Sequence, residues 1–481
     1  MSDPQKLRLS EKISYGFGDL ASCLYWQTIS VYLAIFYTDV FGISALAAGT
    51  MIGLSRSFDA IFDVVIGMLA DRTTSRWGKF RPYLLYTCVP MAVIGLLTFT
   101  VPDFSEKGKL IWAYATFNAL MLIYTTINIP YTAMLGVITP NPIERTALSS
   151  IKFVGAFAGG IIISATLMKM TQVGGWLGAT SLKQGWQMSF VIIGVASIIS
   201  FLIVFFNTKE RVLPPREQKT SVLKDLGDLV TNRPWLVLLA TTITFIFFVA
   251  LRGNAIAHYF KYFVGSQSIT LPEWGILPAA IRGTQTWGWE SLVSVFNTSN
   301  QLLSLIGAML VPLLVRRTGS KPAFVILFVI AILSTAAFYI LKPDQLWLIF
   351  LINAAGSITG GPLSALLWAM YADTADYAEW KTGRRATGLI FSASIFSQKF
   401  GWGWGGGLSL IMLNGVGFVA NQVQTPEALH GLVKLMSIFP SVFGILAILI
   451  LVIFYPLNET KVAEISRDLA ARRAAEGNSP A

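Results

Sequence analysis

The stretch Arg56-Ser57-Phe58-Asp59-Ala60-Ile61-Phe62-Asp63 lies in the middle of an apolar segment that otherwise has the composition of a membrane span. A carboxylate near the centre of a bilayer is costly, so such residues usually face the interior of a helical bundle and have a function there. Spacings of three and four residues put Arg56, Asp59 and Asp63 on one face of a helix. The pattern predicts a site for a coupling Na⁺ or H⁺. The alternative is a structural ion pair between Arg56 and one acid.

The composition is that of an integral membrane protein. Of 481 residues, 54% are hydrophobic and only 13% are charged, whereas soluble domains carry roughly a quarter charged residues. We therefore expect an all-α membrane protein without a separate soluble domain. With roughly twenty residues in each span, the apolar stretches predict about twelve transmembrane helices, near residues 13–37, 46–70, 82–101, 111–135, 149–171, 186–206, 234–263, 290–315, 322–341, 347–371, 386–414 and 431–455.

The net charge of +11 is explained by topology. Most Lys and Arg residues fall in the N-terminal segment, the even-numbered loops and the tail, which the positive-inside rule places in the cytoplasm. We expect a multi-pass protein of the cell (inner) membrane with both termini cytoplasmic, no cleavable signal peptide and no nucleic-acid partner. Two cysteines, two histidines and no metal-ligand spacing predict no metal centre beyond Na⁺ at the acids.

The chain divides into two sets of six spans. The polar, charge-rich segment 207–233 reads as a cytoplasmic linker, with a short surface helix predicted at 222–230, between bundles at 1–206 and 234–455; residues 456–481 form a cytoplasmic tail. The connection at 71–82 corresponds in position to the one at 316–322. Two six-helix bundles around a midplane site are the major-facilitator fold. The external segment 265–288 is too broken for a span, and we expect either a lid or an interfacial loop.

Several motifs occur in order on matching spans: Tyr15-Gly16-Phe17-Gly18-Asp19, Phe36-Tyr37-Thr38-Asp39-Val40, Arg76-Trp77-Gly78-Lys79-Phe80-Arg81-Pro82, Tyr124-Thr125-Thr126-Ile127-Asn128-Ile129-Pro130-Tyr131, Glu144-Arg145-Thr146, the segment 373–383, and Lys399. With them the chain resembles, over essentially its full length, the glycoside–pentoside–hexuronide:cation symporter family. The resemblance implies sugar symport by alternating access, no cofactor other than a coupling ion, and a monomer.

The resemblance also implies a cation site. Asp59, Asp63, Thr125 and Lys399 match the residues that bind the ion and link it to sugar in a permease of that family. Phe62 replaces an amide of that site. Because Na⁺ prefers several hard oxygen ligands and a proton needs one carboxylate, H⁺ is favoured over Na⁺.

Two acids that hold galactosyl hydroxyls in the permease correspond to Cys23 and Asn128, and Asp19 lies one turn earlier. The loss of both acids disfavours an α-galactoside. Lys152 matches a basic residue that contacts sugar. A symporter of a uronide or another anionic sugar is therefore the alternative to a neutral sugar glycoside or oligosaccharide.

Other deep polar and aromatic residues are candidates for contact with substrate. Arg252 lies far along span seven, where it either grips a hydroxyl or carboxylate or pairs with Asp19 or Glu290. The polar stripe Asn297, Asn300, Gln301 and Ser304 must face protein or water, so it binds either a neighbouring helix or substrate. The candidates for stacking on a sugar and bonding its hydroxyls are Trp26, Gln27 and Tyr124.

Charged residues at the cytoplasmic loops are candidates for a latch that holds the outward-facing state, namely Asp71, Arg72, Asp373, Asp376 and Arg385. The alternative is a solvated positive-inside bias. An enzyme is not expected, because no nucleophile–base pair or metal cluster appears in a loop. An uncoupled facilitator or sensor would have no use for buried titratable acids such as Asp59 and Asp63.

Overall fold

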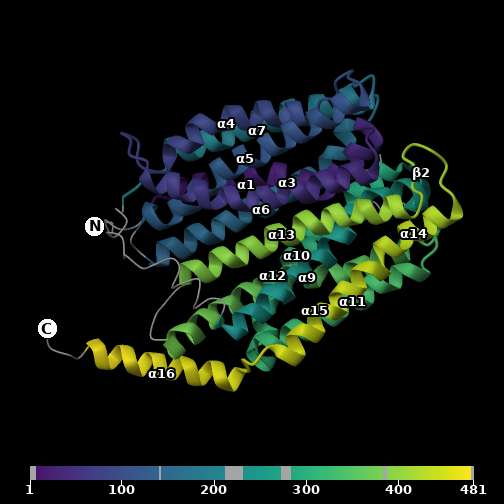
Figure 1. Ribbon diagram of the computed structural model, residues 1–481. Helices are drawn as coiled ribbons and strands as arrows, with labels where there is room; N and C mark the ends of the chain where they lie inside the picture. Colours follow the sequence, from purple (N-terminus) through teal and green to yellow (C-terminus); the bar gives the residue numbers. More distant parts are fainter. Residues whose placement is uncertain (1–6, 140–141, 212–230, 272–282, 383–386, 478–481) are drawn as a thin grey trace.

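The computed structural model describes residues 7–139, 142–211, 231–271, 283–382 and 387–477. Long helices run side by side, and both chain termini lie at one end of the molecule (Figure 1). We call this the terminal end. The opposite end carries an antiparallel hairpin of β1 (Gln267–Leu271) and β2 (Gly283–Trp287), with Ile269 opposite Gln285, and we call it the hairpin end.

Residues 7–211 form the first half, called the N-half. Its first span is longer than the sequence predicts, because α1 continues through two π-helical segments before it ends at Gly42, whose φ of 83° suits a glycine. The elements of this half are α1 (Leu9–Gln27), η1 (Thr28–Tyr32), α2 (Leu33–Ile35), η2 (Phe36–Phe41), α3 (Ala45–Arg72), α4 (Arg81–Thr98), α5 (Glu106–Ile138), α6 (Pro142–Thr171) and α7 (Leu182–Asn207).

Residues 231–477 form the second half, called the C-half. The predicted surface helix at 222–230 lies outside the described residues. The helices of this half are α9 (Arg233–His258), η3 (Tyr259–Val264), α10 (Trp289–Thr318), α11 (Ser320–Ala337), η5 (Phe338–Ile340), α12 (Leu346–Thr382), α13 (Thr387–Gly415), α14 (Pro426–Met436), α15 (Ile438–Phe454) and α16 (Glu459–Gly477).

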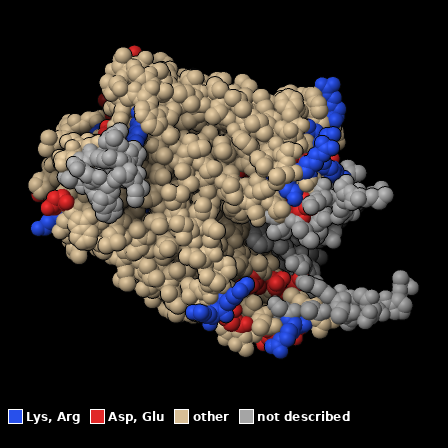
Figure 2. Space-filling view, turned by 180° about the vertical axis from the view of Figure 1, so that it is seen from behind, with Lys and Arg blue, Asp and Glu red and all other residues tan. Residues whose placement is uncertain are grey.

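Among the described residues, ten helical segments are long and apolar enough to cross a membrane. Two more long helices, α3 of the N-half and α13 of the C-half, pack against each other and carry the ionisable residues Asp59, Asp63 and Lys399. Figure 2 shows a broad band almost without charged side chains, which gather towards the two ends of the molecule. The prediction of an all-α membrane protein is confirmed.

The two halves approach most closely where α3 meets α13. A Cβ atom on Gly407 would lie 2.5 Å from the carbonyl oxygen of Gly49, and one on Gly49 would lie 2.5 Å from the carbonyl oxygen of Gly407. A Cβ atom on Gly403 would lie 2.2 Å from Cβ of Arg56. Only glycine permits this backbone contact, since helices in lipid come this close through small residues.

The tail is a helix, which the sequence analysis did not predict. The apolar side of α16 buries Ile465 and Leu469 against the C-half. Trp380 at the end of α12 donates its Nε1–H to Asp468 of α16 at 2.9 Å, and Nζ of Lys461 lies 4.6 Å from the centre of the Trp380 ring. The tail helix is therefore fastened to the terminal end of α12.

The connection between α3 and α4 is held by a carboxylate from far along the chain. Glu210 accepts hydrogen bonds from the backbone N–H groups of Lys79 (2.8 Å), Phe80 (2.8 Å) and Arg81 (2.9 Å), at the N-terminus of α4. Next to it, Arg211 donates two hydrogen bonds to Glu11, at 2.7 and 2.9 Å, and these raise the pKa of the Arg211 guanidinium. The start of the linker is thereby fixed to the N-half.

We expect Glu210→Ala to lower the free energy of unfolding by about 1.5–3 kcal/mol, because a charged acceptor of three backbone donors is lost. Glu210→Gln keeps one acceptor oxygen and should lose less. Thermal unfolding of the purified protein in detergent measures both. Equal melting temperatures for Glu210→Ala and the wild type would contradict this account.

Candidate functional site

Four of the predicted residues meet between the halves. Asp59 and Asp63 project from the middle of α3, and Lys399 reaches them from α13 of the other half. Lys399 Nζ lies 2.5 Å from Asp63 Oδ1 and 3.1 Å from Asp59 Oδ2. Thr125 Oγ1 of α5 lies 2.8 Å from Asp59 Oδ1 and 3.1 Å from Asp63 Oδ1, and its single proton can serve only one of them at a time.

Arg56 completes the charge balance of this site. Its Nη1 lies 3.9 Å from Asp59 Oδ2, and both side chains are buried. Two carboxylates thus face two cations, Arg56 and Lys399, so that the four charges cancel. Arg56 thus pairs with one acid, Asp59, as the structural alternative expects, and Lys399 adds a second cation that reaches both acids. A further cation can enter only if one of the resident cations gives up its place, because an uncompensated buried charge is costly.

An aromatic cluster adjoins the four charges. The guanidinium of Arg56 lies 4.7 Å from the ring centre of Trp26. Trp26 stacks on Tyr124, with ring centres 6.1 Å apart, and meets Trp402 edge to face at 6.0 Å. Trp402 comes from the C-half and was not among the predicted residues. Its position three residues after Lys399, on the same helical face, is the signal that could have identified it.

The N-half also places a second charged pair beside polar groups. Asp19 of α1 lies 3.8 Å from Lys152 of α6. Lys152 Nζ donates to Thr132 Oγ1 at 3.3 Å. Asn128 lies one turn before Thr132 on α5, where its side-chain oxygen accepts from Ser22 Oγ at 2.6 Å.

Arg252 has a different partner from those the sequence suggested. Its Nη2 donates to the side-chain oxygen of Asn353 at 2.8 Å, and the guanidinium lies 5.1 Å from the ring centre of Phe338. Both contacts are within the C-half. The structure shows neither alternative pair, with Asp19 or with Glu290: Asp19 lies beside Lys152, and the guanidinium of Arg252 bonds to a neutral amide through Nη2 while its buried Nε has no hydrogen-bond partner among the described residues.

The polar stripe on α10 forms bonds between helices. Asn297 Nδ2 donates to Tyr32 Oη at 3.2 Å, and Gln301 Nε2 donates to Gln27 Oε1 at 3.1 Å, both across the two halves. Ser304 donates to the carbonyl oxygen of Ser357. Of the two interpretations of this stripe, helix–helix bonding describes these three residues. Asn300 is half-buried on the same helix.

A cluster that sequence analysis missed joins the halves near the hairpin end. Asp39 of η2 accepts from Lys261 Nζ at 2.5 Å and also from the hydroxyl of Tyr262. The backbone oxygen of Asp39 accepts from Asn421 at 2.7 Å, and the neighbouring Thr38 lies 3.1 Å from Nε2 of His258. We call these residues the hairpin-end lock.

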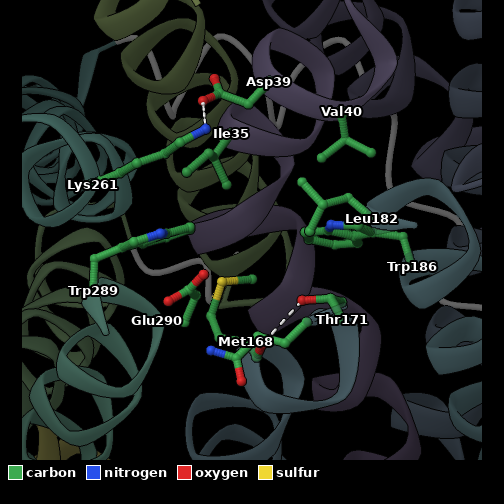
Figure 3. Close-up of a pocket in the computed structure, with 11 residues that line it drawn as sticks. Ile35, Asp39, Val40, Met168, Thr171, Leu182, Trp186, Lys261, Trp289 and Glu290 are labelled. Atoms are coloured by element: carbon green, nitrogen blue, oxygen red, sulfur yellow. Dashed lines mark hydrogen bonds and ion pairs between the residues drawn. The ribbon is translucent and has the colours of Figure 1, made fainter. Parts of the chain in front are cut away.

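A small cavity lies beside the hairpin-end lock. Figure 3 shows Asp39 and Lys261 at one side of it, and Trp289 and Glu290 of the C-half across from Trp186 of the N-half. The cavity is thus lined by both halves. The cross-half bonds named above lie between the middle of the helices and the hairpin end, so the structure is closed on that side.

The residues predicted as a latch lie at the other end of the molecule. Arg72 is exposed at the end of α3, and Asp373 and Asp376 are half-buried near the end of α12. Arg385 and the side chain of Asp71 lie outside the described part of the chain. The latch stays a prediction.

Comparison with known proteins shows which family the chain belongs to. Residues 14–275 and 283–459 match a family model described as MFS/sugar transport protein. The chain belongs to this family. A putative glycoside/cation symporter of Escherichia coli (strain K12) is 34% identical over 98% of this chain and 97% of that protein. An isoprimeverose transporter of Lactiplantibacillus pentosus is 34% identical over 97% of this chain and 92% of that protein.

A solved structure shares the fold. It is a bacterial homolog of the human lysosomal transporter Spinster, with a TM-score of 0.64 and 15% identity over 92% of this chain and 95% of that one. The predictions of a major-facilitator fold, of a resemblance to glycoside–cation symporters and of a membrane transporter that is not an enzyme are confirmed.

The hairpin-end lock yields a prediction about access to the centre. Asp39→Asn removes the charge that holds Lys261, and we expect the hairpin end to open more often. A cysteine in place of the buried Ser30, in a chain with Cys23→Ser and Cys88→Ser, reports this opening. With Asp39→Asn, a membrane-impermeant maleimide applied from the hairpin-end side should react several-fold faster.

Tyr262→Phe should have a smaller effect in the same direction, because it removes the hydrogen bonds of the Tyr262 hydroxyl with Asp39 and with the backbone N–H of Asn421 but leaves the charge of Asp39 in place. Lys342→Gln removes an exposed charge at the same end and serves as the control. Unchanged labelling in both Asp39→Asn and Tyr262→Phe would show that the cluster does not control access.

Proposed function

We propose that this protein imports a neutral sugar glycoside or oligosaccharide together with H⁺, by alternating access between the two halves. One observation carries the proposal: Lys399 of one half bonds to Asp59 and Asp63 of the other. The two buried acids share one lysine across the interface between the halves. Binding of the coupling ion to the acids would therefore change the relative position of the halves. The family and the two named relatives support a sugar as the substrate.

The coupling step begins with the charge balance of the site. When a proton binds Asp63, the carboxylate loses its charge and Lys399 loses the partner that lies 2.5 Å away. Asp59 then faces two cations, Lys399 at 3.1 Å and Arg56 at 3.9 Å, and can match the charge of only one of them. The contact between α3 and α13 is weakened, and the N-half and C-half are then free to move relative to each other. When Asp63 releases the proton on the opposite side of the membrane, its ion pair with Lys399 forms again.

The aromatic cluster is the place where sugar would act on this switch. Trp26 and Tyr124 belong to the N-half and Trp402 to the C-half, so a pyranose ring packed on them would touch both. Aromatic faces suit the apolar C–H surface of a sugar, and Gln27, Asn128, Asp19 and Lys152 offer polar groups for its hydroxyls. Arg56 lies between this cluster and Asp59, so it connects the sugar site with the cation site.

A proton is favoured over Na⁺ as the coupling ion. Phe62 of α3 is 41% exposed and supplies no oxygen to the site. The oxygen atoms around Lys399 come from two carboxylates and one hydroxyl, fewer than Na⁺ prefers when it replaces its water shell. A proton needs only one of the carboxylates.

The second candidate is a symporter of a uronide or another anionic sugar. It is favoured by the replacement of two expected acids by Cys23 and Asn128 and by the presence of Lys152 near them. Arg252 supports it less than the sequence suggested, because its guanidinium is bonded to Asn353.

The orientation in the membrane belongs to the same proposal. The excess of Lys and Arg in segments at the terminal end supports a cytoplasmic location of both termini under the positive-inside rule. The hairpin end, where the bonds of the hairpin-end lock join the two halves, then faces outward. The inner membrane is the proposed location, with the protein acting as a monomer.

Asp63→Asn should abolish accumulation of sugar against its gradient, because a neutral side chain cannot bind the coupling proton. Exchange of sugar at equal concentrations should persist in part, since Asp63 bonds to Lys399 and Thr125. Uptake and counterflow of radiolabelled glycosides in vesicles measure the two activities separately. Asp103→Asn, an exposed acid in a loop, is the control; wild-type accumulation by Asp63→Asn would remove the residue from coupling.

Transport should respond to a proton gradient and not to a Na⁺ gradient. In vesicles that carry the wild-type protein, addition of a transported glycoside should make the outer medium alkaline, because each sugar enters with a proton. An inward Na⁺ gradient at constant pH should leave the rate unchanged. Strong stimulation by Na⁺ without alkalinisation would reverse the assignment of the ion.

A further inference from the structure

Lys152 is a cation on the inner wall of the N-half that takes no part in the Asp59–Asp63–Lys399 site. Its side chain is 20% exposed, and its ammonium lies 3.8 Å from Asp19 and 5.5 Å from the ring centre of Tyr131. By itself such a lysine would attract anionic ligands. Asp19, whose side chain is 16% exposed, cancels that charge.

The position of Asp19 on α1 places it along the route between the halves. Asp19, Cys23 and Trp26 follow one another at spacings of four and three residues, so they share a face of the helix. Trp26 on that face meets Trp402 of the C-half. Asp19 lies two turns, roughly 10 Å, from Trp26 towards the terminal end. A sugar that stacks on Trp26 and extends along α1 therefore reaches the Asp19–Lys152 pair.

The cations of the neighbouring charged site are paired with acids. Arg56 and Lys399 lie against Asp59 and Asp63, whereas Arg252 of the C-half bonds to the neutral side chain of Asn353. Removal of Asp19 would leave Lys152 without the acid that matches it, outside the Asp59–Asp63–Lys399 site.

We propose that Asp19 determines the charge selectivity of the substrate site: by neutralising Lys152, it makes the site accept uncharged glycosides and reject uronides. This inference rests on the proposed function and specifies its substrate class. The pair suits a neutral sugar because the carboxylate accepts from one hydroxyl while the ammonium donates to its neighbour. A uronide carboxylate in the same place would face Asp19, and the repulsion between like charges at short range in a partly desolvated site disfavours its binding.

The experiment compares matched ligands that differ only in charge. The probes are p-nitrophenyl glucoside and p-nitrophenyl glucuronide, each as both anomers, and binding is followed by tryptophan fluorescence of the purified full-length protein. The wild type should prefer the glucoside. Asp19→Asn leaves Lys152 without a matching acid, and the ratio of the two affinities should shift at least ten-fold towards the glucuronide.

Three further variants separate charge from structure. Asp19→Glu keeps the charge and should keep the wild-type ratio. The double variant Asp19→Asn with Lys152→Gln should lose the gained affinity for the glucuronide, because no net cation remains. Asp103→Asn should change nothing. If Asp19→Asn does not fold, Lys152→Gln alone decides the question: it should strengthen the discrimination against the glucuronide.

Each contrary result has a definite meaning. An unchanged affinity ratio in folded Asp19→Asn, or a wild type that already prefers the glucuronide, overturns the selectivity role while sugar symport stands. If folded Asp19→Asn binds neither the glucoside nor the glucuronide, Asp19 serves as an acceptor for substrate hydroxyls in general. That result also overturns the selectivity role. Failure of sugar symport itself appears separately, as absence of glycoside-dependent alkalinisation by the wild type in vesicles.

Discussion

One ammonium group shared by two carboxylates is the interaction on which the rest of the arrangement depends. Lys399 stands on a helix of the C-half and Asp59 and Asp63 on a helix of the N-half, so a single side chain connects the two bodies at their middle. Around this point the protein keeps its charges in equal numbers, with Arg56 as the second cation. Low dielectric makes each imbalance costly, and a binding event that changes one charge therefore has consequences for all four.

The packing around that point allows movement without loss of contact. Glycines at 49, 403 and 407 let α3 and α13 touch backbone to backbone, and a smooth contact of this kind resists sliding less than interlocked side chains do. Further towards the hairpin end the interface changes character: Asp39, Lys261, Tyr262 and Asn421 form directional bonds that hold only in one relation of the halves. The glycine contact at the middle of the interface and the hydrogen-bonded hairpin-end lock together suit a rocking motion of the two halves about the centre.

The sequence indicated the class of protein and the meeting of Asp59 and Asp63 with Lys399, because charged residues inside apolar spans are rare and informative. The same reasoning could not find the hairpin-end lock. Asp39 stands near the end of a span, where an acid is unremarkable, and its partners lie more than two hundred residues away. Trp402 lies among glycines at 401, 403 and 405–407, and an uncharged aromatic residue inside an apolar span gives no comparable signal. For Arg252, depth in the membrane predicted a charged partner, whereas the structure gives its Nη2 a neutral one, the side-chain oxygen of Asn353. The helical tail was missed because its polar composition gives no span signal, although Ile465 and Leu469 are spaced to share one face.

The attachment of α16 to Trp380 has a practical consequence. The tail helix is clamped to α12 by an indole hydrogen bond, by a lysine over the indole ring and by buried aliphatic side chains, so it should travel with the C-half as one rigid body. A fluorophore placed on α16 would then report the position of that half with little motion of its own. Paired with a second dye on the part of the N-half anchored by Glu210, it would turn the distance between the bundles into an optical signal, without any label near the transport path.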